Sequence, residues 1–350
     1  METTLIRRRD ISRCDSSVTE HLRGLKVNLT NKSVVVTGGA GFIGSHLVDR
    51  LIDERPGNLV VVDSFSLGKE RNLYSAKRKY PDLKVYRQDA TKMRQMENIL
   101  RSESVDIVFN LAIVCLPECL AKPKSGYDTN VELTSVICEL ARKGYFRTLV
   151  HFSSSEAYGS AENIPMMENH PLKPTTPYGA SKIASDHLVL SYVQTYGIEA
   201  SIVRPFNAYG PRQNEKTYAG VIPLTINRIF HNESPIIYGD GLQTRDYTYV
   251  TDLTDAAVRV CKERETRGKI LNIASGKETT IKDLVIKIAE LMNSKKPVVY
   301  EEPRLGDVRR FFGSNLVARA LIRYEPRIDL EEGLRLTIKW YSDLFNRKQA

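Results

Sequence analysis

The glycine-rich turn TGGAGFIGS, residues 37–45, constrains the fold more than any other stretch. The apolar run SVVVT before it predicts a buried strand, and GFIGSHLVDRLIDE after it predicts a helix with one apolar face. Gly39, Gly41 and Gly44 match the spacing G-x-G-x-x-G, while Gly38, Gly41 and Gly44 give a second, wider spacing. Glycine lets a backbone turn tightly and approach a pyrophosphate, and a helix N-terminus offers free N–H groups. The turn therefore predicts a dinucleotide site.

Apolar runs and helical patterns alternate along the first 160 residues. The strand-like runs are SVVVTGG, NLVVVDS, KVYRQDA, VDIVFNLA and RTLVHFSS, and the helical ones include KMRQMENILRS and NVELTSVICELARK. This alternation predicts an α/β fold: a Rossmann-type, doubly wound parallel sheet with helices on both faces. Ligands bind at the carboxyl ends of the strands in such sheets.

The second half of the chain is more irregular. Proline is frequent after residue 160, two further strand-like runs are EASIVRPFN and KILNIAS, and TIKDLVIKIAELM is an amphipathic helical pattern. We expect an extension over residues 1–30 and a dinucleotide-binding domain over 31–200. Segments of about 201–210 and 245–275 would return to that domain, and 211–345 would form mainly a smaller C-terminal α/β substrate lobe.

Charge and cysteine content exclude several classes of function. The net charge of +9 suits an anionic ligand, but the basic stretch from Lys69 to Arg94 lacks aromatic residues in a nucleic-acid motif, so we interpret it as a solvated face. The five cysteines are odd in number, and no Cys/His pair matches Cys115 and Cys119 at zinc spacing, so no metal is expected. Since there is no transmembrane run or secretory signal, we expect a cytoplasmic protein without membrane contact.

An acidic residue at the end of the second strand predicts the type of cofactor. Asp63 lies nineteen residues after Gly44, where a carboxylate accepts hydrogen bonds from a ribose diol and repels a 2′-phosphate. NAD is therefore expected rather than NADP, and Asp89 at the third strand end is a candidate for the adenine edge. We expect the cofactor site to comprise Gly38, Gly41, Phe42, Ile43, Gly44, Asp63, Ser66, Asp89, Ala90, Leu111, Ala112, Tyr178, Lys182, Pro205 and Phe206.

A tyrosine and a lysine supply the candidate chemistry. Tyr178 and Lys182 in PYGASKIASDHLV are four residues apart, so they share one face of a helix. The ammonium is expected to lower the pKa of the phenol, which then takes a proton from a substrate hydroxyl as hydride leaves the carbon. Ser154, in the run SSSE that ends a strand, is expected to share that proton.

An ordered set of motifs covers residues 32–345. In sequence order these motifs are TGGAGFIGS, Asp63, SSSEAYG, YGASK, RPFNAYGPRQ, GDGLQTRDYTYVTD and RLGDVRR. The chain resembles the extended short-chain dehydrogenase/reductase family of NAD-dependent nucleotide-sugar epimerases and dehydratases. The resemblance implies that the enzyme keeps its NAD and oxidises a nucleotide sugar at C4, with Tyr178 as base, Lys182 supporting it and Ser154 assisting.

Three outcomes of the resulting 4-keto sugar remain open. Epimerases return the hydride to the other face, dehydratases remove the C5 proton and expel the C6 hydroxyl as water, and decarboxylases act on a 6-carboxylate. Glu156 resembles the base of the family's dehydratases and decarboxylases, so 4,6-dehydration is favoured over 4-epimerisation and over decarboxylation. Ser155 stands where dTDP-glucose dehydratases usually have an aspartate, and Glu156 alternatively caps the following turn.

The resemblance also assigns the other end of the substrate. Asn207, Arg245, Arg304 and Asp307 match contacts to the nucleotide diphosphate, Arg309 is a further phosphate or base partner, and Ser155 is expected to bind substrate. Pro205 and Phe206 are expected to line the nicotinamide. Ion pairing on the surface is the alternative for each arginine.

The sequence departs from the family in one loop. The family often has HLAA where this chain has NLAIVCLPECLAKP, so Asn110 replaces a histidine, and Ile113, Val114 and Cys115 enlarge an apolar wall near the sugar. Helices near residues 131–143 and 178–194 resemble the pair that forms the family's dimer interface, which implies a homodimer. A non-catalytic dinucleotide-binding subunit is disfavoured because Tyr178 and Lys182 are both present.

Overall fold

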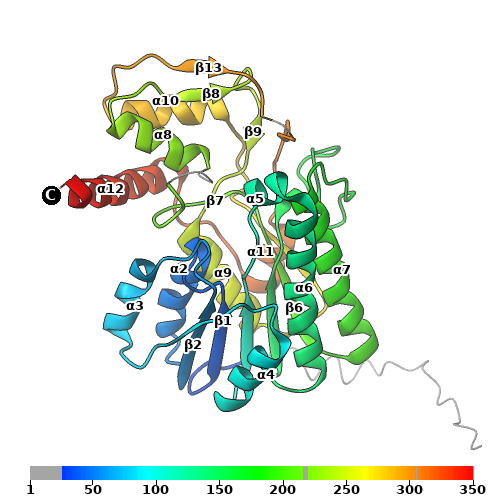
Figure 1. Cartoon of the computed structure of the whole chain (residues 1–350). Helices are drawn as coiled ribbons and strands as arrows, with labels where there is room; N and C mark the ends of the chain where they lie inside the picture. The colour runs from blue at the N-terminus through cyan, green and yellow to red at the C-terminus, as the bar shows by residue number, and fades with distance from the viewer. Residues whose placement is uncertain (1–25, 216–219, 305, 350) are drawn as a thin grey trace, which may run out of the picture.

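A computed structural model describes residues 26–215, 220–304 and 306–349, and its centre is a parallel sheet of seven strands (Figure 1). Across the sheet the order is β11-β6-β5-β4-β1-β2-β3. The strands are β1 (Ser33–Thr37), β2 (Asn58–Asp63), β3 (Lys84–Arg87), β4 (Ile107–Asn110), β5 (Thr148–Phe152), β6 (Glu199–Pro205) and β11 (Ile270–Ile273). The predicted fold class and all seven expected strands are confirmed.

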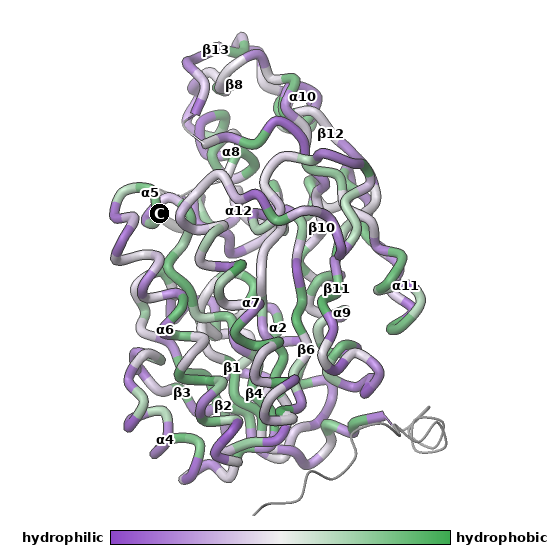
Figure 2. Tube along the Cα trace, turned by 90° about the vertical axis from the view of Figure 1, so that its right-hand side faces the viewer, coloured by the Kyte–Doolittle hydropathy of each residue, from purple (hydrophilic) through white to green (hydrophobic). Residues whose placement is uncertain are grey.

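Helices cover both faces of the sheet, as the apolar strand runs require. One core cluster joins the sheet to α2, α3, α9 and α11, and a second joins it to α4, α6 and α7. These helices are α2 (Phe42–Ile52), α3 (Tyr74–Lys79), α4 (Met93–Ser102), α6 (Pro123–Arg142), α7 (Pro177–Tyr196), α9 (Val250–Lys262) and α11 (Leu316–Ile322). Apolar residues concentrate along the strands in Figure 2. Across the described ranges, no helix combines the length and apolar character needed to cross a membrane.

The connections change direction between β1 and β4. β1 pairs with β2 on one side and with β4 on the other, so the segments that leave β1 and β4 diverge at their carboxyl ends. Thr37 and Asn110 are register partners at that edge. This switch point is where a doubly wound sheet leaves a crevice for a ligand.

A smaller lobe lies above this edge of the sheet (Figure 1). Its core includes Tyr209, Ile226, Leu284, Leu334 and Tyr341. Its elements are β7 (Ala208–Tyr209), α8 (Val221–Phe230), β8 (Ile236–Tyr238), β9 (Thr244–Arg245), β10 (Thr248–Tyr249), β12 (Thr279–Thr280), α10 (Ile281–Leu291), β13 (Val299–Glu301) and α12 (Leu330–Gln349). The remaining elements are α5 (Leu116–Ala121) and the short 3-10 helices η1 (Glu70–Leu73), η2 (Ser155–Ala157) and η3 (Arg264–Thr266).

Two segments differ from expectation. α6 begins at Pro123, seven residues before the helical pattern NVELTSVICELARK, because the polar residues of PKSGYDT hide its periodicity. Gly126 in this extra part lies against α5, where an added Cβ would come within 2.6 Å of the Cys119 sulfur. Of the expected N-terminal extension, residues 26–30 belong to the domain, since Leu29 is fully buried in its core. The rest of that extension lies outside the described residues.

A buried ion pair joins α7 to the sheet. The Asp186 carboxylate accepts hydrogen bonds from Arg204 Nη2 at 2.5 Å and from Ser153 Oγ at 2.7 Å, and both charged side chains are at most 1% exposed. The Arg204 guanidinium also lies 4.4 Å from the centre of the Tyr158 ring. These contacts fix α7 against β6 and against the end of β5.

Arg204→Met is expected to lower the free energy of unfolding by about 3–5 kcal/mol, because it leaves the Asp186 charge buried without its partner. Arg335→Met is the matched control: Arg335 forms a 2.7 Å ion pair with Glu331 and is 62% exposed, so its loss should cost less than about 1 kcal/mol. Urea denaturation of both variants measures the difference. Equal losses of unfolding free energy in the two variants would show that burial does not make the Arg204–Asp186 pair more important for stability than an exposed pair.

Candidate active site

The larger of two adjoining cavities, about 530 Å³, lies at the carboxyl ends of β1, β2, β4 and β5. Its wall includes every residue expected to hold the cofactor except Phe206. These residues are Gly38, Gly41, Phe42, Ile43, Gly44, Asp63, Ser66, Asp89, Ala90, Leu111, Ala112, Tyr178, Lys182 and Pro205. Phe206 is fully buried beside Tyr158 and Phe311, in a separate apolar cluster. Phe206 therefore does not line the cavity, contrary to expectation.

The glycine turn brings backbone close to backbone at one end of this cavity. Gly38 has φ +67°, a conformation that favours glycine. A Cβ on Gly44 would lie 2.1 Å from the Gly38 carbonyl oxygen, so only glycine lets α2 begin this close to β1. Gly41 precedes α2 with no side-chain cap, and the first N–H groups of the helix are therefore available to a pyrophosphate.

The Asp63 carboxylate is fixed beside that turn. Its two oxygens accept hydrogen bonds from Ala40 N at 2.9 Å and from Phe65 N at 2.7 Å. Burial raises the pKa of Asp63, and the two backbone N–H donors oppose that effect by stabilising its charge. A fixed carboxylate on the cavity wall fits a ribose diol, so this end of the cavity suits NAD.

The start of α7 places the candidate catalytic pair, Tyr178 and Lys182, at the other end of the cavity. Thr176 caps the helix by accepting a hydrogen bond from Gly179 N at 3.1 Å, and Pro177 occupies the first turn. Tyr178 and Lys182 follow one turn apart, and Lys182 Nζ donates to the Phe152 carbonyl at 3.0 Å. Burial lowers the pKa of Lys182 to about 8.

The pKa of Tyr178 moves opposite to the direction expected from its lysine neighbour. Burial raises it, the charge of Glu156 raises it further, and a hydrogen bond with the Ser154 side chain opposes both. The Lys182 Nζ lies 5.8 Å from the centre of the Tyr178 ring. Desolvation of the phenol therefore outweighs the ammonium in this structure, a correction to the sequence-based expectation.

The three serines that end β5 have different roles. Ser153 donates to the buried Asp186 carboxylate, whereas Ser154 Oγ accepts a hydrogen bond from Glu156 N at 3.2 Å and contacts the Tyr178 hydroxyl. Ser155 is buried and also lines the cavity. The hydroxyls therefore anchor the strand end and bring Ser154 to Tyr178.

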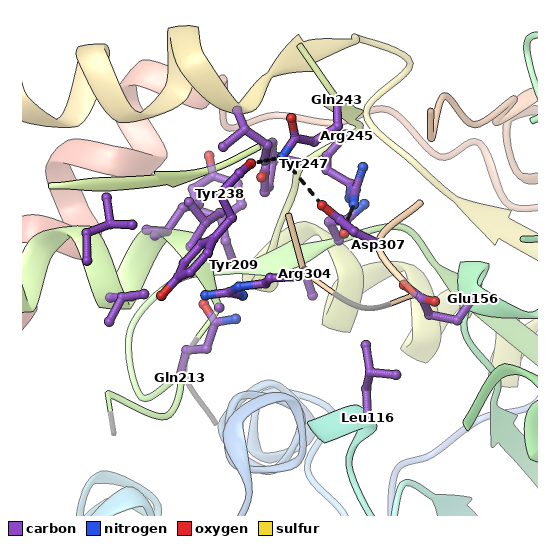
Figure 3. A pocket seen from close by; sticks show the side chains of 18 residues that line it. Leu116, Glu156, Tyr209, Gln213, Tyr238, Gln243, Arg245, Tyr247, Arg304 and Asp307 are labelled. Carbon is purple, nitrogen blue, oxygen red and sulfur yellow. Dashed lines mark hydrogen bonds and ion pairs between the residues drawn. The ribbon is translucent and has the colours of Figure 1, made fainter. Parts of the chain in front are cut away.

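Glu156 lines both cavities, and Figure 3 shows it on the wall of the smaller one. Burial raises its pKa to about 7; Arg245 opposes this rise and Asp307 adds to it. A carboxyl with this pKa exchanges protons readily at neutral pH. The alternative role as a turn cap is not seen, because it is the Ser154 side chain that caps this turn.

The second cavity, about 250 Å³, lies between the sheet domain and the smaller lobe. Asn207, Arg245, Arg304 and Asp307, which the resemblance assigns to the nucleotide diphosphate, line this cavity. Arg245 is ion-paired with Asp307 and donates to the Val308 carbonyl at 2.6 Å. The Arg304 guanidinium lies 4.1 Å from the centre of the Tyr238 ring (Figure 3).

Arg309 is not part of either cavity. It is 60% exposed and pairs with Asp240 at 2.8 Å, which agrees with the surface ion-pair alternative.

In the unusual loop, Ile113, Val114 and Cys115 line the larger cavity. Asn110 does not, because it is buried between Thr37 and His151 and hydrogen-bonds with both.

Several cavity residues were not predicted. They are Lys69, Arg212 and Gln213 near the cofactor end, and Tyr209, Tyr238, Gln243 and Tyr247 in the second cavity. Five of these seven lie inside the motifs RPFNAYGPRQ and GDGLQTRDYTYVTD, which was the available signal. Among the residues that the structure describes, no group of three His, Cys, Asp or Glu side chains is arranged to hold a metal ion.

Comparisons with known proteins agree with this geometry. The family model for the NAD dependent epimerase/dehydratase family matches residues 34–274. A putative UDP-glucose 4-epimerase of Methanocaldococcus jannaschii is 35% identical over 309 residues, which cover 88% of this chain and 97% of that protein. The structure of UDP-glucose 4-epimerase from Thermotoga maritima with UDP-glucose has a TM-score of 0.84 and 32% identity, with 89% and 99% of the two chains covered.

A dehydratase is similar to nearly the same degree. The structure of dTDP-glucose 4,6-dehydratase from Bacillus anthracis in complex with NAD has a TM-score of 0.81 and 29% identity, with 89% of this chain and 97% of that chain covered. The glycine turn, the fixed Asp63 and the Tyr178–Lys182 pair are the parts of the site that suit this cofactor. The chain belongs to the NAD-dependent epimerase/dehydratase family, and its cofactor is NAD.

Proposed function

We propose that this enzyme converts a nucleotide-diphosphate hexose into its 4-keto-6-deoxy product by 4,6-dehydration. The observation that carries the proposal is Glu156, a buried carboxyl with a pKa of about 7 on the wall shared by the two cavities. A 4-keto group acidifies the C5 proton, and a nearby carboxylate is the base that elimination needs. The sugar would lie between Tyr178 and Glu156.

The first half of the reaction needs a proton acceptor at the C4 hydroxyl. NAD, when bound, accepts the hydride from C4 and returns it at the end of the cycle. Tyr178 takes the hydroxyl proton, with Ser154 hydrogen-bonded to it. Lys182, fixed by the Phe152 carbonyl, supplies a positive charge that favours the phenolate.

The second half uses Glu156. Its carboxylate takes the C5 proton, the C6 hydroxyl leaves as water, and C5 later gains a proton from solvent. The bound cofactor would supply the hydride that C6 needs. Once protonated, Glu156 is itself an acid available to the leaving hydroxyl, which is the task of the aspartate that Ser155 replaces. A single carboxyl with a pKa near 7 suits both directions of transfer.

The second lobe is proposed to hold the nucleotide diphosphate. Of the residues that the structure describes, Arg245 and Arg304 are the cations on the wall of the smaller cavity; Asn207 lines both cavities, and Asp307 orients Arg245. Arginine suits phosphate because its planar group donates two parallel hydrogen bonds.

We also propose a homodimer formed through α6 and α7, which pack side by side on one face of the sheet.

4-Epimerisation is the second candidate function, and two observations favour it. Ser155 stands where an acid would assist dehydration, and relatives named as UDP-glucose 4-epimerases from two organisms are 35% and 33% identical to this chain. An epimerase would use the same Tyr178, Lys182 and Ser154 but would not need Glu156 as a base.

Dehydration is expected to depend on pH through two groups. Glu156 must be deprotonated to take the C5 proton, so kcat/KM should rise as pH increases through about 7. Lys182 must be charged to support Tyr178, so kcat/KM should fall above about 8. Glu156→Gln should remove the rising limb and slow elimination by about 100-fold or more.

Glu168→Gln is the control for this pH profile. Burial also raises the pKa of Glu168, but its carboxyl binds Asn272 N and lines neither cavity. Its profile should keep both limbs. If Glu156→Gln retains the rising limb and normal turnover, Glu156 is not the base and the dehydratase proposal fails.

Tyr178→Phe is expected to lower kcat by about 100-fold to 10,000-fold, because it removes the hydroxyl that we propose as the acceptor of the C4 proton. Tyr196→Phe, on the same helix and 55% exposed, should leave kcat unchanged. Product formation followed by mass spectrometry compares the two variants, with bound NAD measured in each. A Tyr178→Phe enzyme with normal kcat would exclude the proposed oxidation at C4.

A further inference from the structure

Residues 211–215, PRQNE, form a short segment, here called the strap, on the wall of the cofactor cavity. Arg212, Gln213 and Asn214 line that cavity, and Gln213 lines the smaller cavity as well (Figure 3). The strap follows β7 and so belongs to the smaller lobe, yet Arg212 and Glu215 form ion pairs with the sheet domain. None of its side chains has a role in the proton transfers proposed above.

The first part of the strap is fixed to α2. His46 Nε2 lies 3.0 Å from the Pro211 carbonyl oxygen, and Arg212 Nη2 donates to Asp49 at 2.6 Å. Burial, followed by the charge of Arg212, lowers the pKa of His46 to about 3, so its ring is neutral and donates to that carbonyl. Both contacts hold the strap against the helix whose N-terminus faces the cofactor.

The last residue of the strap, Glu215, forms two ion pairs with the sheet domain. The Glu215 carboxylate pairs with Lys69 Nζ at 2.8 Å and with Arg71 Nη2 at 2.9 Å, and its side chain is only 4% exposed. Burial raises the pKa of Glu215, but hydrogen bonds from Lys69 and Arg71 outweigh it and lower the pKa to about 2. Glu215 is therefore ionised, and both pairs persist throughout the neutral range.

The strap is also tied to the other lobe. The Tyr341 hydroxyl of α12 donates to the Gln213 carbonyl at 2.5 Å. Ion pairs at both ends and this contact at the middle leave the strap little freedom to lift away from the cavity.

We propose that residues 211–215 are a clasp that retains the dinucleotide, with Glu215 and Asp49 as its two fastening carboxylates. Release of NAD then requires the Glu215 pairs with Lys69 and Arg71 to open, and the rate of cofactor exchange is set at that step. The proposal rests on NAD as the cofactor and not on the choice between dehydration and epimerisation.

Electrostatics alone predicts the opposite effect of removing these carboxylates. NAD carries a negatively charged pyrophosphate, and a carboxylate near an anion weakens its binding. If Glu215 acted only through its charge, Glu215→Gln would strengthen cofactor retention. A clasp predicts that the same substitution weakens retention, so the sign of the change distinguishes the two explanations.

The test uses the purified holoenzyme with its bound NAD. Isotopically labelled NAD is added in excess, and mass spectrometry follows the replacement of the bound cofactor over time. Glu215→Gln is expected to speed exchange by about tenfold or more, equivalent to about 1.4 kcal/mol. Glu70→Gln is the matched control, because it removes the same charge from neighbouring η1 but breaks only the exposed pair with Arg87.

A second variant keeps the proposal testable if Glu215→Gln folds poorly. Asp49→Asn releases the other fastening and should also speed exchange, while Glu70→Gln should exchange at the wild-type rate or more slowly. Exchange that is unchanged or slower in both clasp variants would overturn the proposal. Because the readout is cofactor exchange, this result is independent of whether the enzyme dehydrates or epimerises its sugar.

Discussion

The buried carboxylate of Asp186 is the contact on which the active site depends. It joins α7, through Ser153, to the end of β5 and, through Arg204, to β6. α7 carries Tyr178 and Lys182, and the segment after β5 carries Ser154 and Glu156. A charge pair without access to water tolerates little displacement, since each partner would leave the other unpaired. The relative position of base, hydroxyl and carboxyl is therefore set by an interaction outside the cavity.

Burial also determines the acid–base properties of the site. The same desolvation that raises the pKa of Glu156 to about 7 lowers that of Lys182 to about 8. Glu156 and Lys182, whose ordinary pKa values lie far from 7, thus have pKa values close to 7, where proton transfer in either direction is easiest. Asp63, in contrast, is fixed by two backbone N–H donors and contributes shape and charge to the cofactor end.

Local pattern predicted the sheet and the residues at the glycine end of the larger cavity, for a physical reason. Gly38 and Gly44 owe their positions to backbone geometry, and Asp63 owes its position to the end of a strand; sequence spacing reports both directly. The prediction that Phe206 lines the cofactor cavity was wrong because consecutive residues at a strand end point to opposite faces, so Pro205 faces the cavity and Phe206 faces the core. The predicted fall in the pKa of Tyr178 was wrong because spacing reveals the nearby lysine but not the burial of the phenol.

Contacts between segments far apart in the chain could not be predicted from local sequence patterns. Glu215 and Lys69 are 146 residues apart, and nothing in either local pattern indicates that they pair. Arg309 follows Asp307 by two residues, yet the two side chains have different partners, Asp240 and Arg245. The second cavity is formed by both lobes. The sequence therefore predicted only those of its residues that lie in recognisable motifs.

We propose that Glu156 removes the C5 proton of a 4-keto sugar, and mass spectrometry of nucleotide hexoses incubated with the purified enzyme in heavy water tests this directly. We expect a product that has lost one water and carries deuterium at C5. A product with the mass of its substrate, a new retention time and no deuterium would show that Glu156 does not act as this base and would identify a 4-epimerase.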